Sequence, residues 1–173
     1  MKQTLIIVIF FLVSTVLTAH EIEETLELII NPEYKGAVSL YDKPNGKIVA
    51  SVKHDLEEED YLTFSASKQT SDFFYGTLEY SISGKKMKGW VKKGKHIGTY
   101  TRNYEPEKPL KLMSEASVSS KVNSIIPEWT NQFYQVIAFD KSWAYVNVLY
   151  KGQVKQGWLS PQMQCANPYS ACN

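Results

Sequence analysis

The feature that most constrains the fold of this chain is a stretch that occurs twice. The later copy, residues 140–161, reads DKSWAYVNVLYKGQVKQGWLSP, and the earlier copy, residues 72–92, reads DFFYGTLEYSISGKKMKGWVK. Aligned at a spacing of 68 residues, the copies match at one aspartate, two glycines and one tryptophan. This alignment also places Tyr75 on Trp143, Leu78 on Val146 and Val91 on Leu159. A repeated segment of this kind predicts two related units in one chain.

Each copy has the pattern of a β-hairpin, because side chains of alternating character indicate a strand with two different sides. In the later copy the predicted buried side is Ala144, Val146, Val148 and Tyr150, and the opposite side is Trp143, Tyr145 and Asn147. In the earlier copy these sets are Gly76, Leu78, Tyr80 and Ile82, and Tyr75, Thr77 and Glu79. Gly84 and Gly152 then suit a tight turn that needs positive φ. The glycine before each tryptophan predicts a bulge or a close backbone approach in the return strand.

The N-terminus has the pattern of a secretory signal peptide over residues 1–19. Lys2 precedes an apolar run from Leu5 to Val13, and smaller residues lead to Ala19. The alternative is a membrane-anchoring helix, but the run is shorter than the roughly 20 residues that a span needs. We therefore expect an exported protein, periplasmic or extracellular, with no stable membrane span after the signal is cleaved.

The charge of the mature chain argues against one class of partner. The sequence has 19 Lys and Arg and 18 Asp and Glu, and removal of the signal peptide takes away Lys2 alone, which leaves a formal charge of zero. A nucleic-acid-binding domain usually carries a clear basic excess. We expect no nucleic-acid partner.

The remaining chain reads as all-β, in two halves. Residues 20–35 form an acidic N-terminal lead, in which Leu26, Leu28 and Ile30 alternate as in a strand, although the preceding acidic residues could start a helix. Residues 36–98 form the first predicted domain and residues 110–173 the second. Residues 99–109 contain two prolines and no apolar period, which predicts an extended linker.

Two further features are assigned to local structure. Cys165 and Cys172 flank an Asn-Pro turn signal, and in an exported chain such a pair predicts a disulfide. A zinc site or a thiol nucleophile would need neighbouring ligands or a base, which the sequence does not place nearby. The acidic run Glu57–Asp60 is interpreted as a solvated turn, because the spacing and glycine of a calcium loop are missing. We expect no metal site and no cofactor.

Each half resembles a bacterial Src-homology-3-like (SH3b) domain over residues 36–164. The resemblance rests on the series Leu40, Pro44, Ile48, Tyr75, Leu78, Gly84 and Gly89-Trp90-Val91, and on the series Leu112, Ser117, Val122, Ile126, Trp143, Val146, Gly152 and Gly157-Trp158-Leu159. It implies two small SH3-like β-barrels in tandem, joined by the proline-containing linker. The loop run Asn-Val-Arg-Ser-Gly-Pro, typical of the family, is reduced here to residues 40–44 and 112–116. That departure weakens the transfer of a ligand specificity from the family, because this loop helps to shape the family's groove.

The aromatic side chains are the candidate binding residues. Flat aromatic surfaces stack on sugar rings or pack against extended peptides. The groove candidates are Tyr75, Thr77 and Trp90 in the first half, and Trp143, Tyr145 and Trp158 in the second. The alternative for Trp90, Trp143 and Trp158 is a place in the core or at a bend of a small barrel.

We predict a non-catalytic module, because the chain has no recognisable catalytic motif and the SH3b-like segments leave no room for a separate catalytic domain. The resemblance implies recognition of a cell-envelope ligand, either a peptidoglycan stem peptide or a glycan, through the aromatic grooves. The alternative is a protein–protein adaptor or structural accessory that docks on an envelope protein.

Overall fold

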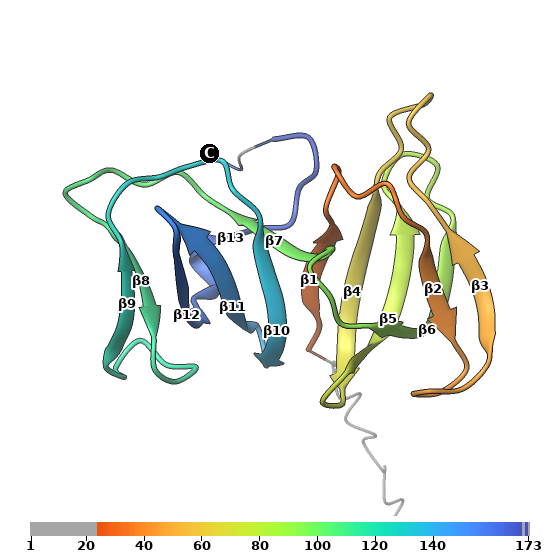
Figure 1. The fold of residues 1–173 in the computed structure, drawn as a ribbon, viewed down its shortest axis with the longest axis horizontal. Coiled ribbons are helices and arrows are strands. Elements are labelled where there is room, and N and C mark those ends of the chain that lie inside the picture. The colour runs from red at the N-terminus through yellow and green to blue at the C-terminus, as the bar shows by residue number, and fades with distance from the viewer. Residues whose placement is uncertain (1–23, 171, 173) are drawn as a thin grey trace, which may run out of the picture.

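The computed structural model describes residues 24–170 and 172, which fold into an all-β structure (Figure 1). The predicted signal peptide lies outside the described residues. The strands are β1 (Leu26–Ile30), β2 (Val38–Tyr41), β3 (Ile48–Val52), β4 (Leu62–Gln69), β5 (Phe73–Tyr80), β6 (Lys86–Lys92), β7 (Ile97–Thr101), β8 (Leu110–Met113), β9 (Val122–Ile126), β10 (Tyr134–Asp140), β11 (Trp143–Tyr150), β12 (Gln153–Leu159) and β13 (Gln164–Cys165). The helical content of the described part is one 3-10 turn, η1 (Pro161–Met163). Within residues 24–170 no helix has the length and apolarity that a membrane crossing requires.

The strands form one open antiparallel sheet whose order repeats. The order is β3-β2-β6-β5-β4-β1-β7-β10-β11-β12-β8-β9, with β13 attached to β7. Every strand pairing among β1–β7 recurs among β7–β13. For example, β2 pairs with β3 and β6, and its counterpart β8 pairs with β9 and β12. In the same way, the pairing of β4 with β5 corresponds to that of β10 with β11. We call β1–β7 the first repeat and β7–β13 the second. Figure 1 shows β2–β6 and β8–β12 as two groups, with β1 and β7 between them.

Strand β7 belongs to both repeats. It pairs with β1 as the last strand of the first repeat, through Ile97 and Gly98. It also pairs with β10 and β13 as the first strand of the second repeat. Thr99 and Thr101 of this strand are fully or almost fully buried. The predicted linker at 99–109 therefore begins inside a strand, and only residues 102–109 connect β7 to β8.

The N-terminal lead also takes part in the sheet. The strand expected from Leu26, Leu28 and Ile30 is confirmed as β1, and these three side chains are buried. Residues 26–30 pair with both β4 and β7. The lead is thus an integral strand of the first repeat and not a segment that precedes it.

The strand registers correct the alignment made from sequence. Tyr75 pairs with Trp90, and Tyr145 pairs with Trp158, so Tyr75 is equivalent to Tyr145 and not to Trp143. By the same register Leu78 corresponds to Val148, because residues 81–84 link the first hairpin whereas 151–152 link the second. A shift of two residues keeps each side chain on its own side of a strand. The predicted buried and opposite sides of each strand are therefore correct, although the sequence alignment of β5 with β11 was displaced by two residues.

The predicted glycine roles are confirmed. Gly84 and Gly152 have φ of 69° and 77° in the two hairpin turns. A Cβ on Gly157 would lie 2.9 Å from the Leu112 Cβ and the Met113 carbonyl oxygen, which is the close backbone approach expected before the tryptophan. One residue of the predicted apolar side is wrong: Ile82 is 62% exposed, because β5 ends at Tyr80 and Ile82 lies in the turn.

The core follows the alternation of the strands. Ala144, Val146, Val148 and Tyr150 are buried, as predicted for one side of β11. The buried set runs through both repeats without interruption and includes Leu28, Phe64, Leu78, Leu112 and Tyr134. Because burial of apolar surface is the main stabilising contribution, we expect the two repeats to unfold together.

Polar contacts tie the repeats together beside the shared strand. The Gln69 side chain donates to the Phe139 carbonyl and accepts from the Phe139 N–H. The Lys93 ammonium donates to the Ile137 carbonyl at 2.8 Å and lies 4.5 Å from the centre of the Phe74 ring. Burial lowers the pKa of Lys93, and the charge of Asp72 partly opposes that shift.

The predicted disulfide between Cys165 and Cys172 is present. The loop that it closes reaches back to the first repeat through Tyr169. The Tyr169 hydroxyl donates to the Glu59 carbonyl at 2.8 Å, and the Tyr169 ring packs edge-on against Tyr61 with 5.4 Å between ring centres. The disulfide therefore fixes a loop that bridges the repeats.

Candidate functional site

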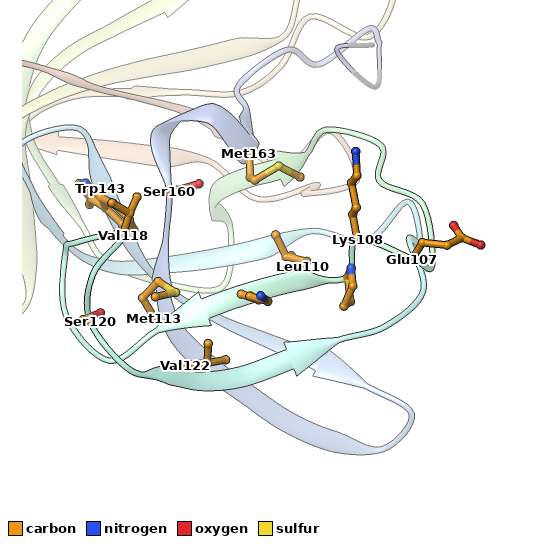
Figure 2. Close-up of a pocket in the computed structure, with 12 residues that line it drawn as sticks. Glu107, Lys108, Leu110, Met113, Val118, Ser120, Val122, Trp143, Ser160 and Met163 are labelled. Carbon is orange, nitrogen blue, oxygen red and sulfur yellow. The ribbon is translucent and has the colours of Figure 1, made fainter.

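A groove of about 540 Å³ lies on the second repeat, beside Trp143 (Figure 2). Its apolar walls come from β8, β9, β11, η1 and the loop between β8 and β9. The lining residues are Glu107, Lys108, Pro109, Leu110, Lys111, Met113, Val118, Ser120, Val122, Trp143, Ser160 and Met163.

Three local features open this groove. Trp143 is the first residue of β11 and lies on the side opposite the core, because Ala144 is buried. The loop of residues 114–121 brings Val118 to the groove, and Figure 2 shows Val118 close to Trp143 in that view. Met163 lines the groove from η1, just after Ser160.

The groove combines an apolar surface with positive charge at its edge. Met113, Val118 and Trp143 provide the apolar surface. Lys108 and Lys111 are exposed, and neither forms an ion pair within the described residues. The exposed Glu107 partly offsets their charge. Such a site suits a ligand that has an apolar part beside a carboxylate.

The equivalent place in the first repeat is filled by an aromatic pair. The strand registers make Phe73 the counterpart of Trp143 and Tyr41 the counterpart of Met113. Phe73 is 2% exposed and packs edge-on against Tyr41, with 5.5 Å between ring centres. The hollow that remains beside Tyr41 is about 110 Å³. The repeats therefore share strand pairing, but of these two equivalent hollows the one in the second repeat is the larger.

The other predicted site residues form two equivalent aromatic pairs. Tyr75 and Trp90 have ring centres 5.2 Å apart on β5 and β6. Tyr145 and Trp158 have the same separation on β11 and β12. All four side chains are partly buried on the side of the sheet opposite the core. These four side chains are therefore neither core residues nor fully exposed to solvent.

The structure brings the six predicted residues together only within each repeat. Thr77 lies next to the Tyr75–Trp90 pair along β5 and lines a shallow pocket of about 300 Å³ with Glu79, Lys86 and Lys88. Trp143 shares its side of β11 with Tyr145. The sequence did not identify Met113, Val118 or Met163 as groove residues. Their apolar side chains were indistinguishable from core residues, since their placement depends on loop length.

No group of three or more His, Cys, Asp or Glu in residues 24–170 is arranged to hold a metal ion. The groove itself contains serines but no histidine. Its chemistry is that of contact surface, hydrogen bonds and charge.

Comparisons with known proteins give only remote similarity. No family model matches the sequence, and no curated protein matches it. Among solved structures, NlpC1 from Trichomonas vaginalis aligns at a TM-score of 0.33 and 11% identity, over 83% of this chain and 46% of that one. NlpC2 from Trichomonas vaginalis aligns at 0.32 and 12%, over 82% of this chain and 48% of that one. The chain spans about half the length of these two proteins. TM-scores this low support no inference about the fold or the function of this chain.

Proposed function

We propose that each repeat is an SH3-like barrel and that the protein is a non-catalytic exported module which binds a cell-envelope ligand. The barrels are fused through β7 instead of being joined by a linker. The Trp143 groove is the binding site for a peptidoglycan stem peptide, and the glycan remains the second ligand class. The observation that carries the proposal is the apolar groove edged by Lys108 and Lys111.

Several properties of the groove support a peptide ligand. Trp143 offers a large rigid surface for an apolar side chain or an aliphatic stem. The two exposed lysines suit a carboxylate, which an extended peptide carries on its side chains or at its C-terminus. Tyr41 and Phe73 fill the equivalent place in the first repeat, so we expect one peptide site per chain.

The test is co-sedimentation of residues 20–173 with purified peptidoglycan sacculi, at low and raised salt. We expect pelleting that weakens with salt but persists, because exposed lysines contribute a screened attraction and the apolar surface does not. Trp143→Ala should weaken binding roughly 30-fold, the scale of a central aromatic contact worth about 2 kcal/mol. Circular dichroism checks that the variant folds.

Tyr75→Ala is the matched control, because it removes a partly buried aromatic from the first repeat. It should leave pelleting unchanged. Equal binding by the Trp143 variant and the unaltered protein would remove the groove assignment. If the unaltered protein does not pellet at all, the adaptor function takes precedence, and cross-linking in the envelope should then identify a protein partner.

A further inference from the structure

The outer side of β10, β11 and β12, opposite the core, presents uncharged side chains in ordered rows. The registers align Ala138 with Tyr145 and Trp158 in one row, and Gln135 with Asn147 and Gln156 in the next. Beyond them Leu149 pairs with Val154, and these two are 64% and 68% exposed. We call these rows the amide–aromatic face.

Half of the eight equivalent positions in the first repeat are charged. The row equivalent to the amides is Ser65, Thr77 and Lys88, and the aromatic row starts with Lys68. The pair equivalent to Leu149 and Val154 is Glu79 and Lys86, which form an ion pair at 3.1 Å. Since the backbone pairing is the same, the fold does not require uncharged residues here. The difference lies in what each face can bind.

The amide row has free hydrogen-bonding capacity. Within the described residues the side chains of Gln135, Asn147 and Gln156 make no hydrogen bond, and the Asn147 Oδ1 is buried without a partner. An amide offers both acceptors and donors. Gln156 is exposed and Gln135 is partly buried, so their amide groups are accessible to the hydroxyls of a ligand.

We propose that the amide–aromatic face binds a neutral oligosaccharide. The Tyr145–Trp158 pair would pack against the apolar side of a sugar ring, and the amide row would hydrogen-bond its hydroxyls, which both donate and accept. The absence of charge from these rows suits an uncharged ligand. Strand β11 is paired on both sides, so no backbone edge is open to an added peptide strand. This site is separate from the groove, although both lie on the same side of β11.

The experiment is an NMR titration of residues 20–173 with chitohexaose and with cellohexaose, two neutral oligosaccharides. We expect shifts of the Asn147 and Gln156 side-chain amides and of the Trp158 indole with at least one of them. Raised salt should leave the affinity unchanged, because no charge is involved. These probes contain no peptide, so their binding reports on this face and not on the peptide groove.

The decisive variant is Asn147→Thr with Gln156→Lys, which installs the residues that the first repeat carries at these positions. Because the fold already accepts them in the same register, we expect a folded protein whose affinity falls at least about tenfold. Lys88→Gln in the first repeat is the control and should change nothing. The proposal is overturned if neither oligosaccharide shifts these signals at millimolar concentration, if the double variant binds equally well, or if the shifts map to the first repeat.

Discussion

His54 should make the stability of this protein depend on pH. It lies between β3 and β4, where its Nε2 donates to the Asn31 carbonyl at 3.0 Å and its Nδ1 accepts from the Leu62 N–H at 3.0 Å. This pattern requires the neutral ring, because a protonated Nδ1 cannot accept. Burial lowers the pKa of His54 below its ordinary 6.5, the Asn31 carbonyl opposes that shift, and the charge of Lys35 adds to it.

The sign of the effect follows from the lowered pKa. Below pH 6.5 the unfolded chain takes up the proton more readily than the folded one, so stability falls as pH decreases through the folded pKa. Replacing His54 by Ala removes two hydrogen bonds and the edge-on contact with Tyr61. We expect a loss of about 2–3 kcal/mol near pH 7.5, from about 0.5–1.5 kcal/mol per hydrogen bond plus lost packing. For a chain of this size that corresponds to a fall in Tm of about 4–12 °C.

Urea unfolding at pH 7.5 and pH 5 measures both quantities. The unaltered protein should lose more stability at pH 5 than His54→Ala does. Partial burial also lowers the pKa of His96, but this residue is present in both proteins, so the difference between them isolates His54. An identical pH dependence in the two proteins would refute this account.

Two other perturbations test contacts that shape the fold. Burial would raise the pKa of Asp60, but hydrogen bonds from the β5–β6 turn outweigh that effect and lower the pKa, so Asp60→Asn should cost about 2 kcal/mol at pH 7 and progressively less as pH falls below 3.8. Urea unfolding at pH 7 and pH 3 checks this, and an equal loss at both would contradict it. Replacing Cys165 and Cys172 by Ser should lower stability by about 2–3 kcal/mol through the lost loop constraint. Faster hydrogen exchange at Tyr169 should accompany that loss, and unchanged exchange would separate the disulfide from the bridge.

The strand pattern was predictable because a period of two residues decides which side chains are buried. Val146 and Val148 are in the core as their alternation indicates. The two glycine turns were equally predictable, since Gly84 and Gly152 adopt a positive φ that few other residues tolerate. The residue-by-residue alignment of the two copies was harder to predict. The turn of the first hairpin is longer by two residues, which shifts the register without disturbing the alternation.

Strand β7 escaped prediction because its sequence, Ile-Gly-Thr-Tyr-Thr, lacks an apolar alternation. Thr99 is nevertheless buried, and its hydroxyl donates to the Tyr100 carbonyl and accepts from the Cys165 N–H. Tertiary context of this kind overrides strand propensity. A polar strand at the junction of two repeats looks like a linker when it is read alone.

The site was predictable in part for a similar reason. Trp143 was identifiable because an aromatic residue opposite a buried side chain stands out in a strand. The walls of its groove depend on the length of the 114–121 loop, and the difference between the repeats depends on Tyr41 meeting Phe73. Neither follows from local periodicity.

Because the two repeats share strand β7, the same arrangement could in principle be extended by further repeats. Because the last strand of one repeat is the first of the next, each added repeat requires six new strands and not seven. Stability in such an array is carried by its internal boundaries as well as by its units. The corresponding strand at the end of the second repeat is β13, which has two residues and is followed at once by the loop that the Cys165–Cys172 disulfide closes. The disulfide loop therefore holds in place the strand from which a further repeat would have to start.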